Sequence, residues 1–96
     1  MKNTVLITGA SSGFGKAAAR LFAKNGWNVV ATMRRPEMEQ DLVGLNDVLV
    51  ARLDVQDRAS ITEAIEAGVA RFGRIEALIN NAGFGLSGLF EATPRE

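Results

Sequence analysis

Short apolar runs alternate with amphipathic stretches along most of the chain. Four runs have the length and the β-branched or aliphatic character of buried strands, and they cover residues 4–8, 27–32, 47–53 and 77–80. Between them, apolar residues return at helical spacing, which predicts helices over residues 13–25 and 58–72. The predicted buried side of the first helix is formed by Phe14, Ala18, Leu21 and Phe22. The predicted buried side of the second is formed by Ile61, Ala64, Ile65, Gly68, Val69 and Phe72.

Residues with strong local preferences mark where the helices start and stop. Gly26 and Gly73 are expected to end the two helices, and Asp57 to cap the start of the second. Pro36 is expected to open a short helix after the second strand. Residues 81–93 are rich in glycine and show no regular period, and Pro94 is expected to begin a further helix.

The alternation of strands and helices predicts a parallel α/β sheet with right-handed crossovers. In the doubly wound arrangement the four strands lie in the order 3-2-1-4. The sheet then changes direction between the first and fourth strands, and ligands bind outside the carboxyl ends of strands at such a point. At 96 residues the chain is at most one domain, so residues 1–96 are expected to form a single, incomplete one.

Composition narrows the function classes. Eleven basic and eleven acidic residues cancel, so no overall field is expected to attract nucleic acid or an anionic membrane. The chain has no cysteine and no histidine, which excludes disulfides, thiolate chemistry, a Ser-His-Asp triad and the commonest metal ligands; no metal site is expected. The first residues lack the long apolar stretch of a signal peptide or membrane span, so a cytoplasmic location is expected.

The most informative segment, residues 8–15, reads Thr-Gly-Ala-Ser-Ser-Gly-Phe-Gly and joins the first strand to the first helix. Gly9 permits the positive φ of a tight turn, Gly13 permits backbone N–H groups to approach a pyrophosphate, and Gly15 permits close helix packing. The free N–H groups at the helix N-terminus favour an anion, and Ser11 and Ser12 add hydroxyl donors. The alternative is a glycine-rich connector that binds no ligand.

The motif Thr-Gly-x-x-x-Gly-x-Gly resembles the cofactor-binding fingerprint of the short-chain dehydrogenase/reductase family. Ser12 stands where the extended branch of that family has glycine, which favours the shorter-chain branch. Residues 80–83 match the family's Asn-Asn-Ala-Gly element, and residues 54–55 match its Asp-Val step. The resemblance implies a truncated Rossmann-like fold that binds NAD(P)(H). The residues it assigns to the cofactor are Gly9, Ser11, Ser12, Gly13, Phe14, Gly15, Asp54, Val55, Asn81, Ala82 and Gly83.

Two of these assignments have structural alternatives. In the family the aspartate corresponding to Asp54 holds the adenine edge, together with the backbone N–H of Val55. The alternative is that Asp54 only caps the turn before the second long helix. Residues 80–83 line the adenosine side of the cofactor in the family, and the alternative for them is an ordinary asparagine–glycine turn.

The end of the second strand indicates which cofactor is preferred. An NAD site carries an acidic residue there, about 20 residues beyond the glycine loop, to bind the ribose 2′-hydroxyl. Here Met33 fills that position and is followed by Arg34 and Arg35, whose guanidinium groups suit a 2′-phosphate. NADP(H) is therefore expected over NAD(H). The alternative is that both arginines are solvated and neutralised by Glu37 and Glu39.

In the family, a tyrosine, a lysine four residues after it, a serine and an asparagine catalyse carbonyl–alcohol interconversion. This chain contains no tyrosine and ends at Glu96, so no catalytic residue is assigned. The resemblance implies a small-molecule carbonyl or alcohol substrate for the intact enzyme, with residues 83–90 either as an apolar wall of its site or as plain packing. The rival reading is a non-catalytic nucleotide-binding module or an inactive fragment. An unpaired edge on the fourth strand predicts a homo-oligomer or a longer parent chain.

Overall fold

The structure, a computed structural model, describes residues 2–81. The predicted loop at 83–90, the helix expected from Pro94, and the residues Ala82 and Gly83 lie outside the described part. The strands are β1 (Thr4–Ile7), β2 (Asn28–Met33), β3 (Val48–Arg52) and β4 (Ala77–Ile79). The helices are α1 (Gly13–Lys24), the 3₁₀ turn η1 (Pro36–Met38) and α2 (Arg58–Phe72).

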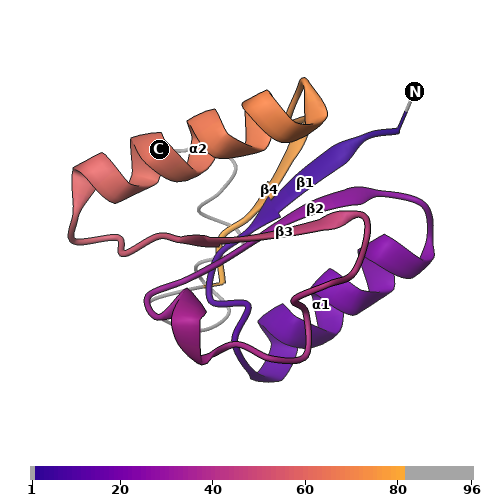
Figure 1. The fold of residues 1–96 in the computed structure, drawn as a ribbon, viewed down its shortest axis with the longest axis horizontal. Helices are drawn as coiled ribbons and strands as arrows, with labels where there is room; N and C mark the ends of the chain where they lie inside the picture. Colours follow the sequence, from indigo (N-terminus) through magenta and orange to yellow (C-terminus); the bar gives the residue numbers. More distant parts are fainter. Residues whose placement is uncertain (1, 82–96) are drawn as a thin grey trace.

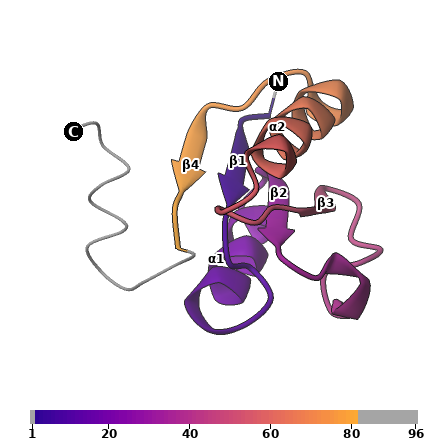
Figure 2. The same cartoon turned by 90° about the vertical axis from the view of Figure 1, so that its left-hand side faces the viewer.

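The four strands form one parallel sheet in the order β3-β2-β1-β4, as predicted. In Figure 1, α2 lies above the sheet and α1 below it. Figure 2 shows β3 and β4 at opposite edges, with β1 and β2 between them. Within residues 2–81, β4 pairs with β1 alone, so its outer edge has no strand partner in this part of the chain.

Successive residues of β1 supply the two core clusters in turn. Val5 and Ile7 belong to the cluster that includes Ala18 and Ala19 of α1. Leu6 belongs to the cluster that includes Ala64 of α2. Side chains of a strand alternate between its faces, so β1 is covered by one helix on each side. Every residue of β1 and β2 is buried, which explains why both read as continuous apolar runs.

The predicted buried sides of both helices are partly wrong. Phe14 and Leu21 are 58% and 60% exposed, and α1 instead buries Gly15, Ala18 and Ala19. On α2, Ile65 and Val69 are exposed, and the buried residues are Ser60, Ala64 and Gly68. The reason is the same in both helices: small residues let the helix axis approach the sheet closely. The larger apolar residues are left at the margins of the contact.

The helix ends agree with the local predictions. The carboxylate of Asp57 accepts a hydrogen bond from the backbone N–H of Ser60 at 3.4 Å, so it caps α2. Gly73 follows α2 with a φ of 90°, and Gly26 follows the end of α1 with a φ of 89°. Both are conformations that glycine adopts readily and other residues rarely do.

Candidate functional site

The glycine loop turns sharply between the end of β1 and the start of α1. Gly9 and Gly13 both have positive φ, 65° and 57°. The loop is fixed to the neighbouring strand ends, because Ala10 N–H donates to the carbonyl of Thr32 and Thr8 N–H to that of Ile79, each at 3.0 Å. The loop therefore spans the carboxyl edge of β2, β1 and β4, at the point where the sheet changes direction.

The N-terminus of α1 is left open by its own side chains. Ser12 occupies the N-cap position with extended backbone, but its side chain makes no capping hydrogen bond, and the first turn holds no acidic residue. The first helical hydrogen bond runs from Lys16 N–H to the carbonyl of Ser12 at 3.4 Å. The N–H groups of residues 13–15 precede it and are thus available to an anion.

Gly15 was predicted to permit close packing of the helix on the sheet. In the structure it packs against the glycine loop itself. A Cβ at Gly15 would lie 2.1 Å from the carbonyl oxygen of Gly9 and 2.9 Å from Nδ2 of Asn81. That Nδ2 also donates to the Gly9 carbonyl oxygen at 3.2 Å. The first turn of α1, the glycine loop and the end of β4 therefore meet at one point, where only hydrogen fits at Gly15.

The threonine before the loop connects it to both asparagines. Thr8 Oγ1 accepts a hydrogen bond from the backbone N–H of Asn81 at 2.7 Å and donates to Oδ1 of Asn80 at 3.1 Å. Both asparagine side chains therefore contact residues 8–9, at the end of β1. The two sequence motifs, 72 residues apart, thus form one hydrogen-bonded unit.

Asp54 has the turn-forming role that was the alternative for it. Its Oδ1 accepts from the N–H of Gln56 at 3.0 Å, and its carbonyl accepts from the N–H of Asp57 at 2.8 Å. Oδ2 lies 4.0 Å from the guanidinium of Arg52. Val55, the next residue, is exposed. Because Oδ2 makes no close hydrogen bond in residues 2–81, the turn and a role toward adenine are compatible.

The two arginines after β2 are exposed and do not form the ion pairs considered for them. Among residues 2–81, neither Arg34 nor Arg35 has a carboxylate within ion-pair distance. Glu39, one of the two acids that the alternative interpretation paired with them, instead contacts Lys16. Met33 is buried, so no acidic group occupies the end of β2.

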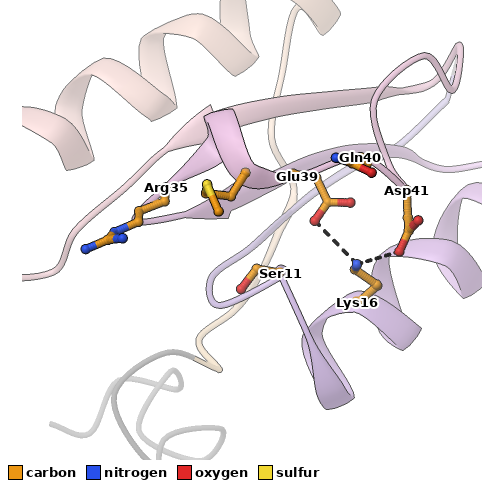
Figure 3. A pocket seen from close by; sticks show the side chains of 7 residues that line it. Ser11, Lys16, Arg35, Glu39, Gln40 and Asp41 are labelled. Atoms are coloured by element: carbon orange, nitrogen blue, oxygen red, sulfur yellow. Dashed lines mark hydrogen bonds and ion pairs between the residues drawn. The ribbon is translucent and has the colours of Figure 1, made fainter.

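A cavity of about 300 Å³ lies between the glycine loop and the segment after β2. Its lining residues are Ser11, Lys16, Arg35, Met38, Glu39, Gln40 and Asp41. Figure 3 shows Ser11 between Arg35 on one side and Lys16 on the other, with the guanidinium of Arg35 directed away from the acidic residues. The cavity thus places a hydroxyl of the loop near a cation that follows β2.

Lys16 and the acidic pair that holds it were not predicted as site residues. Lys16 Nζ lies 2.8 Å from Oδ2 of Asp41 and 3.5 Å from Oε1 of Glu39. The hydrogen bond from Lys16 holds the pKa of the Asp41 carboxyl below its ordinary value. The same bond, with the charges of Glu39 and Asp41, raises the pKa of the Lys16 ammonium. A lysine directly after the last glycine of the motif was the one signal available in the sequence.

Comparison with known proteins identifies the family of this chain. A sequence model of the short chain dehydrogenase family matches residues 3–96. The chain belongs to the short-chain dehydrogenase family. The confirmed family membership agrees with the three motifs and with the strand order that the sequence predicted.

The named relatives of this short-chain dehydrogenase chain are more than twice as long as the chain itself. It is 48% identical over 85 residues to the NADP-dependent 3-hydroxy acid dehydrogenase of Salmonella typhi, covering 85% of this chain and 34% of that protein. It is 43% identical over 91 residues to sulfoacetaldehyde reductase 2 of Chromohalobacter salexigens, covering 91% and 36%. The chain therefore spans about a third of the length of these relatives.

Solved structures show the same fold. A short-chain dehydrogenase from Streptomyces avermitilis superimposes with a TM-score of 0.77 at 40% identity, covering 86% of this chain and 31% of that one. A 3-ketoacyl-(acyl-carrier-protein) reductase from Brucella melitensis, solved with NADH, gives 0.76 at 38% identity, covering 86% and 35%. The doubly wound architecture is thus confirmed.

The described part of this family member brings most of the predicted residues to one edge of the sheet. Residues 9–15, Asn81, Asp54 and Arg35 all follow the carboxyl end of a strand. Residues 2–81 hold no cluster of three or more acidic side chains arranged for a metal ion. Nor does any helix in that range have the length and apolarity to cross a membrane.

Proposed function

We propose that the chain binds the adenosine and diphosphate part of NADP(H) at the carboxyl edge of β1, β2 and β4. The observation that carries this proposal is the uncapped N-terminus of α1 beside Gly9 and Gly13. Three N–H donors and the positive end of the helix dipole meet there, with no acidic side chain in the first turn to occupy them. A diphosphate supplies the negative charge and the acceptors that this end lacks.

The remaining contacts are proposed from position. The residues assigned to the dinucleotide are Gly9, Ser11, Ser12, Gly13, Phe14, Gly15, Arg34, Arg35, Asp54, Val55 and Asn81, together with Ala82 and Gly83 beyond the described part. Asp54 is suited to the adenine edge because its Oδ2 remains available. Asn81 acts indirectly, because its amide is already bonded to the Gly9 carbonyl and holds the loop in shape.

The preference for a 2′-phosphate rests on Arg34 and Arg35. Both are exposed, and neither is paired with an acid in residues 2–81. A hydrogen bond to a charged group contributes about 1.5–3 kcal/mol, which corresponds to roughly 10- to 150-fold in affinity. The name of the Salmonella relative, an NADP-dependent enzyme, supports this preference. The Brucella structure, solved with NADH, shows that the same fold also accepts the other cofactor.

For the intact protein we propose carbonyl–alcohol interconversion. The nicotinamide would supply a hydride to the carbonyl carbon and an acid would protonate the oxygen. The present chain has no tyrosine, so residues outside these 96 would supply that acid. The same absence favours a second candidate for the chain taken alone, a nucleotide-binding module without catalysis. NADPH oxidation that depends on an added carbonyl compound, measured with this chain, would rule out the second candidate.

Calorimetric titration with 2′-phospho-ADP and with ADP tests the binding proposal. We expect both to bind, with 2′-phospho-ADP at least about tenfold tighter, the lower end of one charged hydrogen bond. Arg35→Gln should reduce that ratio. Arg71→Gln, a charge-matched control whose guanidinium contacts the carbonyl of Asn46 before β3, should not. Equal affinities would refute the NADP preference, and no binding of either nucleotide would refute the site.

A further inference from the structure

Lys16 lines the same cavity as Arg35, one of the residues proposed for the 2′-phosphate, yet it faces two carboxylates. Its Nζ is 2.8 Å from Oδ2 of Asp41 and 3.5 Å from Oε1 of Glu39. In Figure 3 one contact runs from the ammonium of Lys16 to Glu39 and the other to Asp41, while Ser11 lies between Lys16 and Arg35. The ammonium of Lys16 therefore lines the same cavity as Arg35 but is already paired with Glu39 and Asp41.

The two acids differ in what else they do. The side chain of Glu39 is 2% exposed, and its Oε2 accepts a hydrogen bond from the N–H of Leu42 at 2.8 Å. Leu42 is fully buried in the core cluster against α1, so Glu39 helps to hold the segment after η1 in place. A buried carboxylate with both oxygens in use has a structural role.

Asp41 has no such role. Its side chain is 55% exposed, and its contacts in residues 2–81 are the two cations of α1, Lys16 at 2.8 Å and Arg20 at 3.6 Å. Removing the Asp41 carboxylate leaves the core and the Glu39–Leu42 bond intact. What it changes is the charge of the cavity: Lys16 and Arg35 are now matched by Glu39 and Asp41, and one cation would then be in excess.

We infer that Asp41 is a specificity-determining residue that keeps Lys16 from contacting a phosphate in this cavity and thereby limits the preference for 2′-phosphorylated nucleotides. The inference rests on the proposed function. A phosphate entering the cavity meets the repulsion of Asp41 and an ammonium that is already paired. Without Asp41, Lys16 loses its shorter ion pair and keeps only the 3.5 Å contact with Glu39, so its ammonium can turn toward the phosphate more easily.

The test is the ratio of Kd for ADP to Kd for 2′-phospho-ADP in four forms of the chain. Asp41→Asn should raise the ratio about threefold, the size typical of one exposed ion pair. Combining Asp41→Asn with Lys16→Gln should return the ratio to within about twofold of the unchanged chain, because the pair is neutral in both forms. Asp47→Asn is the matched control, since Asp47 pairs with Lys2 beside the amino ends of β1 and β3, away from the carboxyl ends where the site lies.

Three results would overturn the inference. The first is an unchanged or lower ratio in Asp41→Asn. The second is a ratio for the double variant far below that of the unchanged chain, which would show that Lys16 already binds the phosphate. The third is an equal rise in Asp47→Asn, which would show an effect of net charge alone. The proposed function fails separately, if the unchanged chain binds neither nucleotide. Circular dichroism of each variant confirms that the comparison is between folded proteins.

Discussion

Replacing Gly15 with alanine is the sharpest test of how the glycine loop is built. The new Cβ would lie 2.1 Å from the carbonyl oxygen of Gly9, 2.8 Å from its carbonyl carbon and 2.9 Å from Nδ2 of Asn81. Two of these three atoms are backbone, and the third is hydrogen-bonded to that same carbonyl. None is the free end of a flexible side chain, so the loop or the helix has to move.

The cost follows from the contacts. Overpacking against backbone falls near the upper end of the usual range, about 3 kcal/mol. Loss of the Asn81–Gly9 hydrogen bond adds about 1 kcal/mol. Alanine returns about 1 kcal/mol through its higher helix propensity. The free energy of unfolding should therefore fall by about 3 kcal/mol, a large share of the stability of a domain of this size.

Gly68→Ala provides the control, because it makes the same substitution inside α2. Its Cβ would meet Cγ2 of Val30 at 2.8 Å and Cδ1 of Ile75 at 3.1 Å, which are side-chain rather than backbone atoms. Overpacking of about 1–3 kcal/mol is offset by about 1 kcal/mol of helix propensity, so the loss of stability should be smaller than for Gly15→Ala. Urea unfolding followed by circular dichroism measures both. A Gly15→Ala variant no less stable than Gly68→Ala would refute the close contact between Gly15 and the loop.

Three further substitutions test the surroundings of the site. Thr8→Val should cost about 1–3 kcal/mol in urea unfolding, because the N–H of Asn81 loses its acceptor, while Thr8→Ser should retain most of the stability. Leu42→Ala should cost about 2–5 kcal/mol, since the side chain is fully buried; a smaller loss would mean that the segment after η1 is not anchored there. The hydrogen bond from Arg52 lowers the pKa of the Asp57 carboxyl. Its stabilising effect is therefore complete above the ordinary aspartate pKa of about 4 and is lost as the pH falls through the lowered value. Asp57→Asn should flatten the acid side of the stability profile, and an unaltered profile would contradict this cause.

Sequence alone determined the features that depend on short-range chemistry. Alternating buried runs and helices predicted a parallel sheet with right-handed crossovers, and the doubly wound pattern then gave the strand order. The ends of the helices followed from residue type, since Gly26, Gly73 and Asp57 have preferences that act within a few residues. The glycine loop and the Asn-Asn-Ala-Gly element were recognisable because each is a run of consecutive residues that resembles a family motif.

Tertiary structure decided which groups approach one another across the chain. The periodicity of α1 suggested that Phe14 and Leu21 face the sheet, but both are exposed, and the residues that α1 buries there are Gly15, Ala18 and Ala19. Lys16 and Asp41 are 25 residues apart and belong to different elements, so no local pattern links them. Glu39, which is near Arg34 and Arg35 in sequence, contacts Lys16 instead. Local preferences act over a few residues, whereas packing distance and charge pairing arise only once separate segments occupy the same space.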